Sequence, residues 1–353
     1  MNFLVLVFLF LLILGFFCSC PNPTKRKTSF FVFISLAILL FLRTFVDVQS
    51  VPDLEAYSLG YNEIKEIGFF KLMSARLDYV KIDEVGFRYL MKIVGMVFSS
   101  FFYFLFGVSL LWLVGYRRVM KSYSPYIILS ILLLVVGSYF QSIFVLRQHI
   151  AIIIVFLSYK YIINRKLLKY LLMISLAFLM HQTAIVALPL YFFYHVKNVK
   201  QFMLVFLLLM VYLYFNFSYL LTFAGTELLQ GYTSYLDSEV KTNSTLALKV
   251  ALELALFVAI LKRDALREGI NKLLFLSLSI GLVISICGIG FNPTNRMVMY
   301  YTSVSFLTVP IMVKYAKSSL VKNLIILLFL SLYTYMTFFG SGFVFLSDFR
   351  LDL

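Results

Sequence analysis

Stretches of about 20 mostly apolar residues, separated by short polar or charged segments, recur along the chain. An α-helix needs about 20 apolar residues to cross the roughly 30 Å hydrocarbon layer of a bilayer. The runs are too long and too continuous for barrel strands, so helices are left to satisfy their backbone hydrogen bonds in lipid. We therefore predict an all-α, polytopic membrane protein. Its expected spans lie at about 2–20, 29–46, 90–115, 125–146, 148–163, 201–221, 246–261, 272–290, 296–313 and 320–340.

The segment 167–194 does not fit a single span. Two apolar pieces of about 12 to 14 residues flank a polar interruption formed by His181, Gln182 and Thr183. Each piece is short for a full span, so we predict a broken hairpin with His181 at its outward tip. The total is then about 11–12 transmembrane helices. One long tilted helix is the alternative, and it would leave two downstream lysines on the outer side.

The composition excludes a soluble globular domain, because 62% of the 353 residues are hydrophobic and only 13% are charged. No fixed-period repeat or soluble segment interrupts the apolar pattern, so we expect a single membrane domain over 1–353. The formal net charge of +15 would suit nucleic acid. In multi-spanning proteins, however, lysine and arginine collect in cytoplasmic loops. We therefore predict no nucleic-acid partner.

The charged residues also set the expected orientation. Clusters of Lys and Arg all fall on one side of the predicted topology, and the positive-inside rule makes that side cytoplasmic. Eight of the 16 acidic residues lie in the segment 47–89 on the opposite side. We predict that 47–89 is a long outer loop and that 222–245 is a second one. Loops of such length are usually functional or carry short helices of their own.

Three ionisable residues on the outer side are candidates for chemistry. Arg147 lies in otherwise apolar sequence, and an ionisable group at such a depth is a functional-site candidate by default. His181 suits a general base or a hydrogen bond to a sugar hydroxyl. Arg296 follows a short polar turn, and together with Arg147 it would present two planar donor forks suited to a diphosphate. Snorkelling at a helix end is the competing explanation for both arginines.

Two acidic residues of the loop 47–89 are candidate bases. Asp53 lies near Tyr57, and Glu84 lies near Phe87, as carboxylates of sugar-binding surfaces lie beside aromatic rings. Such a carboxylate could accept the proton of an attacking hydroxyl. For either residue, a solvated loop charge is the more frequent explanation.

The remaining polar features in apolar sequence are assigned no chemistry. His149 is two residues from Arg147 and points to a different side of a helix, and Arg43, near an outer helix end, is interpreted as a snorkelling side chain. The three cysteines have neither metal spacing nor a disulfide framework, and we predict no metal at the site. Nucleotide-binding patterns are missing from the sequence. We therefore expect an already activated, membrane-held donor and no cofactor.

Several short motifs resemble one known family. The central block comprises LRQHIA at Leu146–Ala151, K-Y-x-x-x-R-K-x-L-K-Y at Lys160–Tyr170 and LAFLMHQTAIVALPLYF at Leu176–Phe192. Looser matches are DLEAY at Asp53–Tyr57, DEVGF at Asp83–Phe87 and NRMVMYY at Asn295–Tyr301. Together they resemble the EpsG-type family of bacterial exopolysaccharide and capsule polymerases, which are Wzy-like in role. The resemblance covers most of the chain from about residue 45 to 315.

The resemblance implies a polymerising glycosyltransferase similar to the C-type membrane glycosyltransferases. Such an enzyme moves a growing glycan from undecaprenyl diphosphate to a lipid-linked repeat unit at the outer face of the bacterial inner membrane. Its catalytic residues would be His181 with Asp53 or Glu84 as the base. Its substrate-binding residues would be Arg147, Arg296, Gln148, Tyr57 and Asn295.

The expected partners are lipid-linked oligosaccharides and membrane lipid, and a chain-length regulator protein is a further candidate. Two alternative functions stay open. One is a lipid-linked oligosaccharide flippase or transporter, which would need a continuous polar path where the inner halves of the spans are uniformly apolar. The other is a membrane transferase that adds a single sugar or acyl group.

Overall fold

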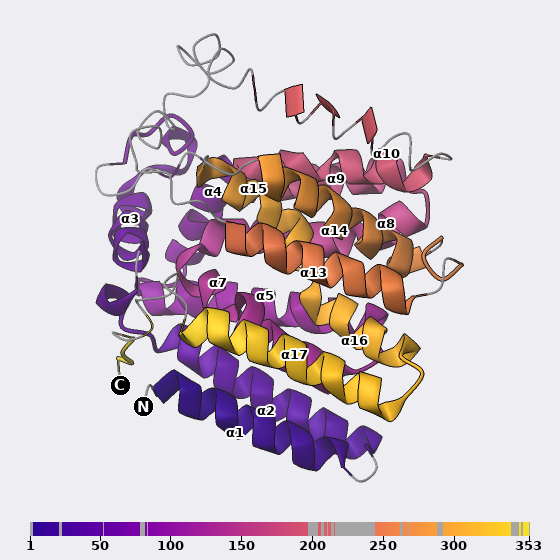
Figure 1. The fold of residues 1–353 in the computed structure, drawn as a ribbon. Helices are drawn as coiled ribbons and strands as arrows, with labels where there is room; N and C mark the ends of the chain where they lie inside the picture. The colour runs from indigo at the N-terminus through magenta and orange to yellow at the C-terminus, as the bar shows by residue number, and fades with distance from the viewer. Residues whose placement is uncertain are drawn as a thin grey trace. The chain divides into compact units, whose positions relative to one another are not determined.

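The computed structural model describes residues 3–20, 23–51, 53–77, 82, 84–196, 204–205, 208–209, 211–212, 215, 244–261, 264–267, 269–287, 292–339, 346 and 349–352. These residues form helices and no strand, which confirms the predicted all-α class (Figure 1). The predicted outer loop 222–245 lies outside them up to residue 243.

The helices follow the apolar runs of the sequence. In chain order they are α1 (Phe3–Ser19), α2 (Lys25–Thr44), η1 (Val48–Ser50), α3 (Leu54–Glu66), η2 (Phe69–Lys71), α4 (Val85–Gly95), α5 (Phe101–Tyr123), α6 (Ile127–Leu134), η3 (Val135–Tyr139), α7 (Gln141–Phe144), α8 (Leu146–Ile163), α9 (Leu167–Met180), η4 (Gln182–Ala187), α10 (Pro189–His195), α13 (Ser244–Ile260), α14 (Gly269–Cys287), α15 (Asn292–Thr302), α16 (Ser305–Tyr315) and α17 (Ser319–Phe338). The element η3 is a π-helical turn, whereas η1, η2 and η4 are 3-10 turns.

Within the described residues, six helical stretches are long and apolar enough to cross a membrane. They are Lys25–Thr44, Phe101–Tyr123, Leu146–Ile163, Gly269–Ile286, Arg296–Tyr315 and Ser319–Phe338. Shorter apolar helices lie at Phe3–Ser19, Ile127–Tyr139 and Leu167–Met180. By length and composition, the protein is therefore a multi-pass membrane protein.

The predicted span 90–115 is wrong. Two helices occupy it, because α4 ends at Gly95 and α5 begins only at Phe101. Ser100 starts α5 by accepting a hydrogen bond from the backbone N–H of Phe102 at 3.2 Å. Because the stretch 90–115 is apolar on average, its hydropathy does not reveal that Ser100 caps a new helix within it. The helix α5 then continues to Tyr123, well past the predicted end.

The described chain falls into two compact units, which we describe one at a time. The first comprises Met1–Leu157, Ser175–Gln182 and Ser305–Leu353, and the second comprises Ser158–Ile174 and Thr183–Val304. That 1–353 acts as one membrane domain stays a prediction.

In the first unit, α2 packs against α1, α5 and α6, and α16 packs against α6 and α17. The core between them is aromatic: the ring of Tyr116 meets Phe306 at a centroid distance of 5.1 Å and Phe156 at 6.0 Å. Residues near the end of the chain also join this unit, because the backbone of Leu351 forms an isolated antiparallel bridge with Val46. The bridge lies next to the start of the segment 47–89.

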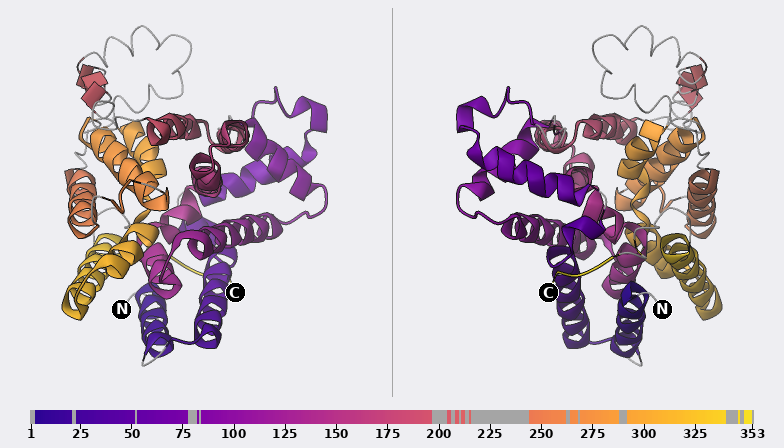
Figure 2. Two further views of the ribbon diagram at one scale, coloured as in Figure 1. Left: turned by 90° about the vertical axis from the view of Figure 1, so that its right-hand side faces the viewer. Right: turned by 90° about the vertical axis from the view of Figure 1, so that its left-hand side faces the viewer.

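The segment 47–89 carries α3 and the start of α4, which pack against each other and against α5 (Figure 2). Polar contacts at the ends of these helices fix the pair. The ammonium of Lys92 donates to the carbonyl of Lys65 at 2.6 Å, and the hydroxyl of Tyr61 donates to the carbonyl of Phe98 at 2.7 Å. The described residues of this segment therefore include packed helices, and its placement on the outer side stays a prediction.

In the second unit, α14 packs against α10, α13 and α15. Tyrosine hydroxyls hold the turn η4 in place: Tyr170 donates to the carbonyl of Ala187, and Tyr301 donates to the carbonyl of Val186. Thr183 at the start of the turn donates to the hydroxyl of Tyr300 at 3.3 Å. Because Tyr300 and Tyr301 lie on α15, the helix that carries Arg296 is tied to η4.

Candidate functional site

His181 lies at the interruption that the sequence predicts. The helix α9 ends at Met180, the backbone N–H of His181 still bonds to the carbonyl of Ala177 at 2.9 Å, and η4 begins with the next residue. The following helix α10 starts with Pro189, a residue well suited to a first helical position. The break therefore leaves a buried histidine at a helix end, with 5% of its surface exposed.

Arg147 is presented by an elbow between α7 and α8. The π-helical turn η3 leads into the four-residue helix α7, and Val145 then leaves helical geometry with φ −94° and ψ 54°. The helix α8 begins at Leu146, so Arg147 lies in its first turn. A side chain at this position leaves the helix near its end and can meet a partner from another element.

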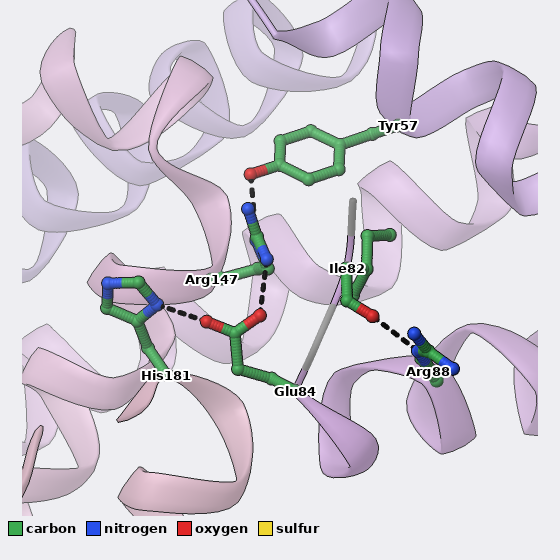
Figure 3. A network of polar contacts seen from close by, with 6 residues as sticks. All are labelled: Tyr57, Ile82, Glu84, Arg88, Arg147 and His181. Carbon is green, nitrogen blue, oxygen red and sulfur yellow. Dashed lines mark hydrogen bonds and ion pairs between the residues drawn. The ribbon is translucent and has the colours of Figure 1, made fainter. Parts of the chain in front are cut away.

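Glu84 immediately precedes α4. A carboxylate at an N-cap commonly bonds to its own helix, but Glu84 makes no such capping bond. Arg88, one turn further along α4, donates to the carbonyls of Leu72 and Ala75. It also donates to the carbonyl of Ile82, two residues before Glu84 (Figure 3). The side chain of Glu84 points toward Arg147 and His181 (Figure 3).

These residues meet in the first unit, with Glu84 between the other two (Figure 3). One carboxylate oxygen, Oε2, pairs with Nη1 of Arg147, and the other, Oε1, lies 2.6 Å from Nδ1 of His181. The Nε of Arg147 donates to the hydroxyl of Tyr57 at 3.1 Å. The four side chains come from α3, the start of α4, the start of α8 and the end of α9. The structure therefore joins four of the residues that the sequence singled out.

The electrostatics of Glu84 follow from its two partners. Burial alone would raise its pKa, but the hydrogen bond from His181 and the charge of Arg147 outweigh burial and lower the pKa from 4.5 to about 2. Burial raises the pKa of Tyr57, against an opposing effect of Arg147. At neutral pH Glu84 is therefore a carboxylate and Tyr57 a neutral phenol.

The other four predicted site residues have different places. Asp53 is exposed, one turn before Tyr57 on α3, in the left-handed region with φ 64°. Gln148 is completely buried in α8. Arg296 is half-buried on α15 in the second unit, and Asn295 precedes it there. Substrate binding by Gln148, Arg296 and Asn295 stays a prediction.

Sequence reasoning missed Arg88 and misread Arg43. Arg88 looks like an ordinary residue of a short amphipathic helix, and only the structure shows that its guanidinium donates to three backbone carbonyls. Arg43 was interpreted as a snorkelling side chain, which is wrong: only 1% of its surface is exposed. Within the described part of the chain, no three His, Cys, Asp or Glu side chains gather as metal ligands would.

Gly86 lets α4 approach the end of α9 closely, so it bears on the contact between Glu84 and His181. A Cβ at Gly86 would lie 2.7 Å from the carbonyl oxygen of Leu179. We expect Gly86→Ala to force the two backbones apart, at a cost of about 1–3 kcal/mol, and to lower the unfolding midpoint in detergent. Gly68→Ala is the control, since a Cβ there would meet nothing within 4 Å. Equal unfolding midpoints for Gly86→Ala and Gly68→Ala would show that the packing of α4 against α9 does not depend on a glycine at position 86.

The clustered residues all fall within one stretch that matches a known family. The sequence profile of the EpsG family matches residues 50–349, which is most of the chain. The chain belongs to the EpsG family. EpsG is a Wzy-like polysaccharide polymerase family, so this EpsG protein is a polymerase-type membrane protein. No curated protein and no solved structure matches it.

The clustered side chains of this EpsG protein are of types that can take part in group transfer. A guanidinium can stabilise the negative charge of a phosphate leaving group. An imidazole whose Nδ1 meets a carboxylate has a fixed ring orientation and can move a proton through Nε2. The three short motifs around Glu84, Arg147 and His181 are far apart in the sequence, and they converge on one carboxylate.

Proposed function

We propose that this EpsG protein polymerises a polysaccharide from lipid-linked repeat units at the outer face of the bacterial inner membrane. The growing glycan would leave its undecaprenyl diphosphate carrier and be joined to the non-reducing end of an incoming lipid-linked unit. The observation that supports the proposal is that the buried carboxylate of Glu84 contacts both the guanidinium of Arg147 and the imidazole of His181.

In the proposed reaction, a hydroxyl of the acceptor sugar attacks the anomeric carbon of the donor. The bond between that carbon and the diphosphate oxygen breaks, and a glycosidic bond forms. The hydroxyl proton passes to Nε2 of His181, and the undecaprenyl diphosphate leaves with the bonding electron pair. Arg147 would stabilise the charge that develops on the diphosphate.

Glu84 is better suited to orient His181 than to act as the base. A general base works best when its pKa lies near the operating pH, whereas the partners of Glu84 hold its pKa at about 2. A carboxylate that accepts from Nδ1 of a histidine fixes the tautomer whose Nε2 can take a proton. Tyr57 would hold the guanidinium of Arg147 from its other side through the contact at Nε.

A deletion strain tests the proposed function directly. Lipid-linked oligosaccharides extracted from the deletion strain and separated on a gel should be single repeat units, and the ladder of longer products should return when the gene is restored. A flippase would instead leave single units that a membrane-impermeant oxidant, added outside the cell, cannot reach. A transferase that adds one group would change the size of the single unit. An unchanged ladder would refute polymerisation.

A further inference from the structure

A second buried cation lies in the first unit, in the last turn of α2. The Nε of Arg43 donates to the hydroxyl of Ser109 on α5 at 3.1 Å, and its Nη1 donates to the hydroxyl of Ser142 on α7. The guanidinium carbon lies 4.9 Å from the ring centroid of Trp112 on α5. Arg43 thus links three helices.

The partners of Arg43 are neutral. None of the ion pairs among the described residues involves it, although its side chain is as deeply buried as the aromatic core around it. A buried charge without a counter-charge is costly, and well-packed apolar residues usually serve stability as well or better. An arginine in this place is therefore evidence for a role other than stability.

Two residues near Arg43, Ser142 and His149, lie on either side of Arg147 in the sequence. Ser142 lies five positions before Arg147 and accepts directly from Arg43. His149 lies two positions after Arg147, and its ring centroid is 6.3 Å from that of Trp112. Two residues along a helix are about 200° apart, so His149 and Arg147 leave α8 on opposite sides.

The elbow between these two contacts is not a regular helix. The π-helical turn η3 precedes it, and such turns are frequent at functional sites. Tyr139, at the end of η3, donates to the carbonyl of Leu39 on α2 at 2.6 Å. Val145 then leaves helical geometry, although its N–H still bonds to the carbonyl of Gln141 and its carbonyl accepts from the N–H of His149. The side-chain contacts to α2 and α5 are additional restraints at this elbow.

We propose that Arg43 is a positioning residue for Arg147. By binding Ser109 and Ser142 and stacking on Trp112, Arg43 fixes the elbow from which Arg147 reaches Glu84. This inference rests on the proposed function for its effect on polymerisation, but its structural part does not depend on the reaction. Arg43 would act through the placement of Arg147 and would not touch the substrate.

Variants at Arg43 separate positioning from folding. We expect Arg43→Met to lower the turnover of lipid-linked units, extracted from the deletion strain, by about 10- to 100-fold, since displacements of about 1 Å can cost as much. Its unfolding midpoint should match that of wild type. Arg43→Lys should recover part of the turnover, because a lysine keeps the cation but not the fork. Thr44→Ala is the control, since the hydroxyl of Thr44 bonds only within its own helix.

The fluorescence of Trp112 tests the coupling without any enzymatic assay, because it is the one tryptophan in the sequence. We expect Glu84→Gln and Arg147→Lys to shift its emission in the direction produced by Arg43→Met, while Thr44→Ala leaves it unchanged. The inference would be overturned if the emission of Trp112 were unchanged in Glu84→Gln and Arg147→Lys. It would also be overturned if the Arg43 variants lost turnover only in proportion to a loss of folded protein. If the wild type fails to polymerise while the emission still responds, the proposed function fails and the positioning of Arg147 stands.

Discussion

Replacing Arg147 with alanine is expected to abolish long-chain polysaccharide while single repeat units remain on their lipid carrier. The substitution removes the cation proposed to hold the diphosphate, and losing one donor to a developing negative charge typically costs about 10²–10³-fold in rate. It also removes one of the two partners that keep Glu84 ionised. A gel of polysaccharide and lipid-linked oligosaccharide from the complemented deletion strain measures both products.

Two further substitutions make the result at Arg147 specific. Arg147→Lys keeps a charge but cannot bind Glu84 and Tyr57 at once, so it should give shortened chains. Arg117→Ala removes an exposed arginine on α5 and should leave the ladder intact. Normal chain length in Arg147→Ala, with the protein present at its usual level, would show that this guanidinium is not needed for polymerisation.

The class of fold could be predicted from the sequence because lipid imposes a strong constraint. Apolar stretches of about 20 residues can satisfy their backbone in a bilayer only as helices, and α2, α8, α14 and α17 follow their predicted runs. The prediction failed at 90–115, where the local contacts of Ser100 divide one apolar run between two helices. Hydrophobic averages detect burial in lipid but do not detect a helix cap.

The candidate site could be predicted residue by residue but not as an arrangement. Arg147 and His181 were conspicuous because ionisable groups are rare in apolar sequence. Glu84 was one of eight acids in its loop, and nothing in the sequence marked it as the residue that joins the other two. That role depends on partners from α8 and the end of α9, which lie far from Glu84 in the sequence.

The misreading of Arg43 has a similar cause. Near the end of an apolar helix, a snorkelling arginine and a buried one have the same sequence pattern. Their difference lies in residues far along the chain, because Ser109 and Ser142 supply the acceptors that make burial tolerable. Single hydroxyls in apolar helices are common, so neither serine could have been paired with Arg43 in advance.

Glu84→Gln is expected to have the second large effect, although it changes one atom. The amide retains the shape of the side chain, but it leaves Arg147 without its counter-charge and cannot hold His181 as a carboxylate does. Because Glu84 is proposed to orient His181, the substitution should impair the proton transfer to His181. General base catalysis typically contributes about 10²–10⁴-fold, so we expect the ladder to disappear. Glu55→Gln is the control, since it removes an exposed charge from α3 in the same segment, 47–89. Wild-type turnover in Glu84→Gln would exclude any role for this carboxylate in the reaction.

The same substitution should alter how stability depends on pH. Because folding lowers the pKa of Glu84 from 4.5 to about 2, ionised Glu84 stabilises the folded protein by about 3 kcal/mol. This contribution is complete above pH 4.5 and is lost as the pH falls through about 2. Unfolding midpoints in detergent should therefore differ between wild type and Glu84→Gln at neutral pH and converge as the pH falls through this range. A constant difference down to pH 2 would contradict a pKa of about 2 for Glu84 in the folded protein.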